Sequence, residues 1–131
     1  MKLIFSILLV VSILSLSAQN KKDYSRQVAT LDSTIETLYS VISGDQGVES
    51  DWDICKHLFH KEAKLIPTQK TEEGTSVARF MSPEDYISTS GKWLLENGFH
   101  EVEIHRETQT FGNITQVFST YESFRSKGDI E

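Results

Sequence analysis

The sequence predicts an α+β domain in which helices cover one face of an antiparallel sheet. Three stretches of the chain place apolar residues three and four positions apart, the spacing of an amphipathic helix. Two later stretches alternate apolar with polar residues, which is typical of strands with one solvent-facing side. Because all three helical stretches precede the two long strands, we expect antiparallel pairing with the helices on one side of the sheet.

Each expected helix has a recognisable boundary. The first covers residues 24–43 and stops at Gly44, a residue common just after a helix end. The second opens at residues 50–53, where Ser-Asp-Trp-Asp has the spacing of a capping box. The third opens with a cap at Ser82 and a proline at Pro83, and an Asn-Gly pair ends it. The apolar stripes of these helices are, in chain order, Tyr24, Val28, Leu31, Ile35, Leu38 and Ile42; Ile54, Cys55, Leu58 and Phe59; and Tyr86, Ile87, Trp93 and Leu94.

Four strands are expected, two short and two long. Residues 63–67 form a short apolar strand whose final proline restricts it to an edge or an end, and residues 77–81 form another. Residues 68–76 lie between them, are polar and contain a glycine, so we expect a mobile loop. The long strands are residues 101–106 and 112–122, which we expect to pair with each other.

The N-terminus predicts export. An early lysine precedes an apolar run over residues 3–16, and a small-residue pair ends at Ala18, which is the order of a secretory signal peptide. We therefore divide the chain into a signal peptide (1–18), an N-terminal linker (19–27) and one domain (28–131), located in a periplasm or outside the cell. An uncleaved membrane anchor is the alternative, but the run is shorter than a spanning helix needs, so we expect no stable membrane insertion after cleavage.

Composition excludes several classes of partner. The net charge is −6, which argues against non-specific binding of nucleic acid and against adhesion to anionic membranes. The single cysteine, Cys55, rules out a disulfide within the chain. Because Cys55 lies beside Ile54 in a helical pattern, we expect it to be a small buried hydrophobe; a reactive thiol or an intermolecular bridge is the alternative.

Three segments together carry a family resemblance. The stretch WDICKHLFHKEAKLIP at residues 52–67, the helix from Ser82, and the strand FGN…VFSTYES within residues 111–123 resemble the SnoaL-like branch of the nuclear transport factor 2-like superfamily. The resemblance covers roughly residues 31–123. It implies a cystatin-like cone, in which a curved antiparallel sheet wraps around about three helices and an apolar pocket opens at one end. It also implies a homodimer that forms through the sheet.

The resemblance further implies that strands are missing here. Members of the superfamily continue with long strands after the position of the FSTYES segment. In this chain residues 126–129 have the composition of a hairpin turn, and no returning strand follows. We therefore expect the domain to lack its C-terminal strands.

No known catalytic group of the superfamily is recognisable. In the ketosteroid isomerase group a helix tyrosine and a strand aspartate act together, and their places fall here on Thr37 and Pro67, which lack both functions. Tyr39 lies two residues further on, about 200° around a helix, so we do not expect it to substitute. His57 and His60 share a helix face, but a zinc site needs a third ligand, so we expect no metal and no cofactor.

Strand parity selects the candidate ligand-binding residues. Val102 and Ile104 are the apolar alternates of their strand, so we expect their face to meet the helices. Arg106 continues this parity and is the expected polar anchor of the pocket, with Glu122 or Asp53 as its partner; an ion pair at the rim is the alternative. The candidate ligand-binding residues are Tyr86, Trp93, Arg106, Ser119 and Tyr121.

Two classes of function remain. The first is an exported small-ligand-binding or structural module without recognisable catalytic groups, whose partner is a small apolar ligand. The second is a lyase, isomerase or hydrolase that acts on a small apolar substrate, with Arg106, Tyr121 and His105 as the leading polar groups. A carboxylate or imidazole placed beside Tyr121 would favour the enzyme.

Export provides a first testable prediction. N-terminal sequencing of the exported protein is expected to begin at Gln19, because the small Ser17-Ala18 pair follows the apolar run directly. A protein that keeps Met1 and fractionates with membranes would instead identify an uncleaved anchor.

Overall fold

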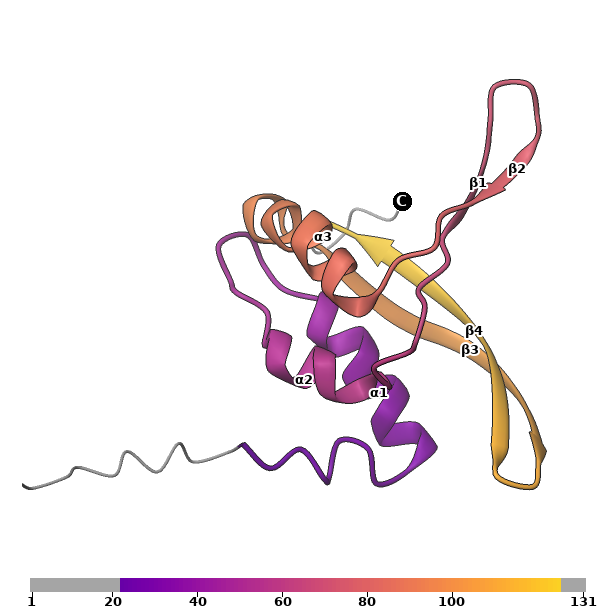
Figure 1. Ribbon diagram of the computed structural model, residues 1–131. Coiled ribbons are helices and arrows are strands. Elements are labelled where there is room, and N and C mark those ends of the chain that lie inside the picture. Colours follow the sequence, from indigo (N-terminus) through magenta and orange to yellow (C-terminus); the bar gives the residue numbers. More distant parts are fainter. Residues whose placement is uncertain (1–21, 126–131) are drawn as a thin grey trace, which may run out of the picture.

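The computed structural model describes residues 22–125, which form three helices and four strands (Figure 1). The predicted signal peptide and the predicted turn at residues 126–129 lie outside the described residues. The α+β class and the three helices are confirmed. The elements in chain order are α1 (Leu31–Ile42), α2 (Trp52–Leu58), β1 (Thr68–Lys70), β2 (Ser76–Ala78), α3 (Pro83–Asn97), β3 (His100–Phe111) and β4 (Ile114–Phe124).

The strands form two separate antiparallel hairpins instead of one sheet. The β3–β4 pair is a long two-stranded ribbon with the helices gathered on one side, and β1–β2 projects away from the helices as an arm (Figure 1). Residues 63–67, expected as a strand, contribute only an isolated bridge between Leu65 and Met81. Residues 68–76, expected as a loop, contain β1, the turn and the start of β2. The sequence-based boundaries of the short strands were therefore wrong.

The helix starts are set by local caps. At α3 the Ser82 hydroxyl accepts from the Asp85 N–H while the Asp85 carboxylate accepts from the Ser82 N–H, which confirms the predicted start. At α2 the cap is Asp51, one residue after the predicted Ser50. At α1 the cap is Thr30, so the helix begins several residues later than predicted.

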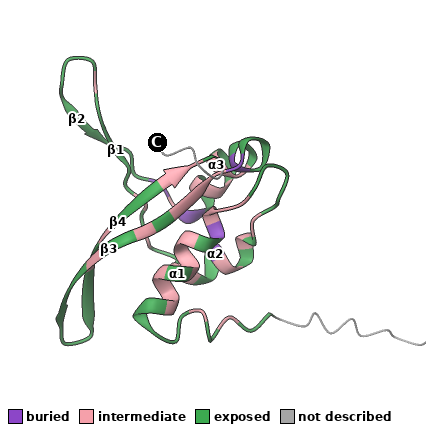
Figure 2. Cartoon of the chain, turned by 180° about the vertical axis from the view of Figure 1, so that it is seen from behind, coloured by how far each residue is buried: buried purple, intermediate pink, exposed green. Residues whose placement is uncertain are grey.

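The core is small and lies where the helices meet. Buried hydrophobic side chains of the described residues are Val41, Cys55, Met81 and Leu94. Cys55 is only 2% exposed, which confirms it as a buried hydrophobe, and burial raises the pKa of its thiol. Figure 2 shows the buried positions concentrated among the helices, whereas the β1–β2 arm and the free end of the ribbon are exposed. Much of the molecule therefore depends on contacts that are only partly shielded from water.

The side chains of β3 face differently from the prediction, and the strand contains a β-bulge. Glu103 pairs with Tyr121 and His105 pairs with Thr120, so Ile104 is an extra residue in β3. Val102 and Ile104 are 51% and 55% exposed and lie on the outer face of the ribbon, not toward the helices as predicted. The inserted residue reverses the alternation of faces after it, so Arg106 lies on the same inner face as Glu103.

Gly98 provides a test of how α3 joins the ribbon. Its φ of +69° and ψ of 149° suit glycine almost alone, and a Cβ at this position would lie 2.8 Å from the Gln46 amide nitrogen. We expect Gly98→Ala to lower the free energy of unfolding by more than about 3 kcal/mol, measured by urea denaturation, because strain and a backbone clash add. Gly47→Ala is the control, since φ is +84° but no atom lies near; its expected loss is about 1–2 kcal/mol. Equal losses would contradict a clash at Gly98.

Candidate functional site

A cavity of about 450 Å³ lies between the helices and the ribbon. Its walls come from all three helices and both long strands, so it exists only in the folded chain. Apolar side chains such as Leu38, Ile42 and Phe59 make up most of the lining. The polar and titratable side chains that line it are Tyr39, Cys55, Tyr86, Glu101 and Tyr121. A mostly apolar wall with a few convergent polar groups is typical of a small-molecule site.

Glu101 is the carboxylate of this cavity. Its backbone N–H donates to the Ser43 hydroxyl at 2.9 Å, which fixes the start of β3 against the end of α1. Within residues 22–125 its side chain makes no hydrogen bond or ion pair, and burial raises the pKa of its carboxyl group. Burial also raises the pKa of Tyr86 to about 12, and the charge of Glu101 contributes to that shift. The carboxylate and the Tyr86 hydroxyl therefore act on each other in the same apolar space.

A polar network lies behind the cavity on the inner face of the ribbon. Arg106 donates to Glu103 twice, from Nε to Oε1 at 2.9 Å and from Nη2 to Oε2 at 2.5 Å, and its Nη1 donates to Asp32 at 2.6 Å. Ser119 donates to Glu103 Oε1, and the Ser119 and Tyr39 hydroxyls are hydrogen-bonded at 2.7 Å. Because Arg106 and Ser119 donate to it, the pKa of Glu103 lies below its ordinary value. The network connects the ribbon to α1 and reaches the cavity through Tyr39.

The structure places the five predicted ligand-binding residues in three different surroundings. Tyr86 and Tyr121 line the cavity. Ser119 and Arg106 belong to the network behind it, and Arg106 pairs with Glu103 and Asp32, not with the predicted Glu122 or Asp53. Trp93 lies elsewhere.

Trp93 is 42% exposed and does not contribute to the cavity wall. Its ring packs edge-on against Phe99 at 6.1 Å, and the Arg125 guanidinium lies 5.7 Å from its centroid. Trp93 therefore lies at the start of the ribbon, beside Phe99, and not in the wall of this cavity.

Sequence reasoning missed Glu101 and set Tyr39 aside. The expectation that Val102 and Ile104 face the helices implies that Glu101, which alternates with them, faces solvent. Tyr39 faces the cavity, whereas Thr37 donates to the Ser33 carbonyl and lines a different pocket. The tyrosine could have been found from the predicted stripe, because it lies beside Leu38 and one turn from Ile42, both on the apolar face.

Three other predicted polar groups lie outside the cavity. His57 packs its ring against Tyr24 at 5.4 Å, and the His60 ring accepts from the Glu62 N–H. His105 is exposed on the outer face of the ribbon, 3.7 Å from Glu107. Among residues 22–125 no three metal-ligating side chains gather into a metal site, and no helix there is long and apolar enough to cross a membrane.

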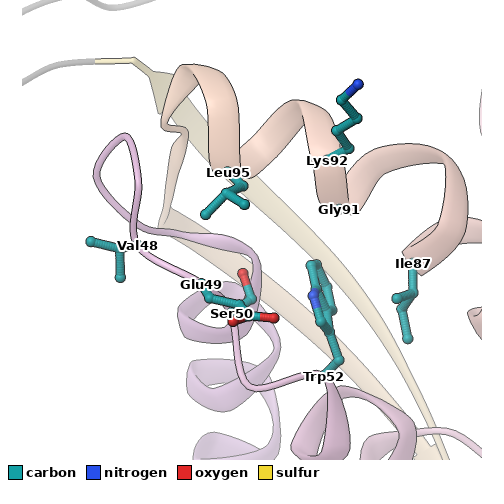
Figure 3. A pocket seen from close by; sticks show the side chains of 8 residues that line it. All are labelled: Val48, Glu49, Ser50, Trp52, Ile87, Gly91, Lys92 and Leu95. Atoms are coloured by element: carbon teal, nitrogen blue, oxygen red, sulfur yellow. The ribbon is translucent and has the colours of Figure 1, made fainter.

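A second, smaller pocket of about 240 Å³ lies beside α3 (Figure 3). Trp52 stands in its middle, directed at Gly91, and a Cβ at Gly91 would lie only 3.2 Å from the indole. Leu95 and Val48 form its other end, and Lys92 points away from it. Because Gly91 has no side chain, α3 can approach Trp52 closely. We therefore interpret this pocket as space left where α2 packs against α3.

No protein-family model matches the chain, and no curated protein or solved structure is significantly similar to it. The resemblance to the SnoaL-like branch therefore stays a prediction. The cavity has to be interpreted from its own residues.

The pKa shift of Glu101 predicts how stability responds to its removal. A carboxyl group whose pKa is raised by folding weakens the folded state once the pH exceeds its unfolded pKa. We expect Glu101→Gln to raise the melting temperature by about 4 °C at pH 7, and the gain to vanish below about pH 4, where both forms are neutral. A loss of stability at pH 7 would mean that the carboxylate has a stabilising partner.

Glu103→Gln is the matched control of opposite sign. The pKa of Glu103 is lowered in the folded state, chiefly by the hydrogen bonds from Arg106, so its charge stabilises the fold above its unfolded pKa. We expect this variant to melt lower at pH 7, and the difference to shrink as the pH falls through the lowered pKa. Thermal melts of both variants across the acid range measure how the melting temperature of each one changes with pH.

Proposed function

We propose that the protein is an exported module that binds a small apolar ligand in the cavity between the helices and the β3–β4 ribbon. The observation that carries this proposal is the cavity itself. Its volume of about 450 Å³ lies within the roughly 300–1,000 Å³ of small-molecule sites. Its lining is mainly apolar, with Glu101 and three tyrosines as the polar groups. Export is supported by the order of charged, apolar and small residues over residues 1–18.

We also propose that the domain is an incomplete cone of the nuclear transport factor 2-like type. An antiparallel ribbon with helices on one side supports it, since further strands added beside the ribbon would extend it into a curved sheet. Val102, Ile104 and Phe118 on the exposed outer face support the proposed homodimer through the sheet. The net charge of −6 supports a partner that is not nucleic acid.

One observation favours a second candidate, an isomerase or lyase that acts on a small apolar substrate. Glu101 shares the cavity with Tyr86 and Tyr121, and a carboxylate whose pKa is raised by burial is a better proton acceptor near neutral pH. In that case Glu101 is the base and a tyrosine hydroxyl donates to the developing negative charge. If the protein is an enzyme, we expect Glu101→Gln to abolish turnover while ligand binding persists. If it is a binding module, neither the unmodified protein nor the variant shows turnover.

Cavity occupancy can be tested with a neutral fluorescent dye, N-phenylnaphthylamine. We expect saturable binding to the intact protein, and affinity at least about tenfold weaker for Leu38→Trp, because the indole fills space that the ligand needs. Ile114→Trp is the control, since it adds the same ring at an exposed position near the turn of the ribbon, outside the cavity lining. Circular dichroism checks that both variants are folded.

Absence of saturable dye binding, or equal affinity in folded Leu38→Trp, would contradict the proposal. Native mass spectrometry of protein purified from its source is the complementary measurement. A retained small molecule whose mass disappears in Leu38→Trp is the expected result.

A further inference from the structure

The charged side chain among the described residues that line the cavity is acidic. Among residues 22–125, Glu101 is the acid that lines it, and no Lys, Arg or His side chain of that range does so. The titratable groups that line the cavity with this carboxylate are Tyr39 from α1, Cys55 from α2, Tyr86 from α3 and Tyr121 from β4, and none of them is a basic side chain. A half-buried carboxylate without a counter-ion is costly, and a ligand that brings a positive charge would offset that cost.

The network behind the cavity fixes the direction of one hydrogen bond. Glu103 is held as a carboxylate by Arg106, so it can only accept, and the single proton of Ser119 is committed to it. The hydrogen bond between Tyr39 and Ser119 must then run from the tyrosine to the serine. With its proton used there, the Tyr39 oxygen can only accept from a ligand. The cavity wall therefore offers acceptors at both Tyr39 and Glu101.

Aromatic rings supply the remaining surface next to these acceptors. Tyr39 and Tyr121 lie with ring centroids 6.0 Å apart and planes tilted by 52°, and Tyr86 and Phe59 line the same space. The face of an aromatic ring attracts a cation, and the attraction grows when the site is shielded from water. The hydrogen-bond acceptors, the carboxylate and the aromatic faces all favour a positively charged group that donates hydrogen bonds.

Resting on the binding function proposed above, we propose that the ligand of this cavity is an apolar amine. Its protonated nitrogen pairs with Glu101, donates to the lone pair of Tyr39 and lies against the tyrosine rings, while its apolar body occupies the space around Leu38 and Ile42. Carboxylic acids are disfavoured by repulsion from Glu101. Alcohols of the same length fit the space but bring no charge to pair with the carboxylate.

The test compares three ligands that share one apolar body: octylamine, octanol and octanoate, each used to displace N-phenylnaphthylamine at pH 7. We expect octylamine to bind about tenfold more tightly than octanol, and octanoate to bind most weakly. Octylamine stays protonated across the acid range, as a lysine side chain does. Its affinity should fall as the pH is lowered through the titration of Glu101, while that of octanol should not change.

Two variants assign the preference to the proposed groups. Glu101→Gln is expected to lower the affinity for octylamine to that of octanol while leaving octanol and the dye unchanged. Tyr39→Phe is expected to weaken octylamine several-fold, because it removes the accepting oxygen. Glu107→Gln, on the exposed outer face of the ribbon, is the matched control and should bind all three ligands like the unmodified protein.

The outcomes separate this inference from the proposed function. If octanol or octanoate displaces the dye as well as octylamine does, the amine proposal is wrong and cavity binding stands. The same holds if Glu101→Gln weakens all three ligands equally. If the dye does not bind and titration calorimetry shows no binding of octylamine, the proposed function itself fails. The comparison on the unmodified protein needs no variant, so a misfolded variant leaves the test intact.

Discussion

The β-bulge at Ile104 determines which of the side chains that follow it in β3 face the helices. Without it, Glu101, Glu103 and His105 would follow one another on the inner face, and Arg106 would point to solvent. With one residue inserted, Arg106 returns to the same face as Glu103, and its guanidinium can hold that carboxylate. The ion pair between Arg106 and Asp32 of α1 depends on this change of parity. Arg106 also holds Glu103, which accepts from Ser119, and Ser119 is hydrogen-bonded to Tyr39 of α1.

This dependence matters because apolar burial in the described part of the chain is limited. Four hydrophobic side chains of residues 22–125 are buried, and they lie among the helices instead of under the ribbon. The ribbon is joined to α1 by hydrogen bonds from Arg106 and between Ser119 and Tyr39, and by the contact of the Tyr39 and Tyr121 rings. Its outer face remains exposed at Val102 and Phe118. Backbone groups along the outer strand edges are open to pairing with another strand. One face of the ribbon therefore lines the cavity, and the other remains exposed.

The two acidic residues of the inner face have opposite electrostatic surroundings only two positions apart. Glu103 is surrounded by donors, so its charge is stabilised and its pKa is lowered. Glu101 has apolar and phenolic neighbours, so its charge is destabilised and its pKa is raised. The Glu103 carboxylate has a structural role, because it accepts from Ser119 and thereby orients the hydrogen bond between Ser119 and Tyr39. The Glu101 carboxylate has no such partner among the described residues, which is why both proposals for the cavity rest on it.

The sequence by itself determined the elements whose signals are local. The start of α3 at Ser82 and Pro83 follows from capping and backbone geometry within four residues, and the burial of Cys55 follows from a helical stripe. Only the tertiary structure decided that Glu101 and Tyr39 meet in one cavity. The alternation of Val102 and Ile104 resembles that of a buried strand face, yet both side chains lie on the exposed outer face. The bulge that returns Arg106 to the inner face leaves no mark in the sequence pattern. The choice of face was made by packing against α1, which brings together residues about 60 positions apart in the chain.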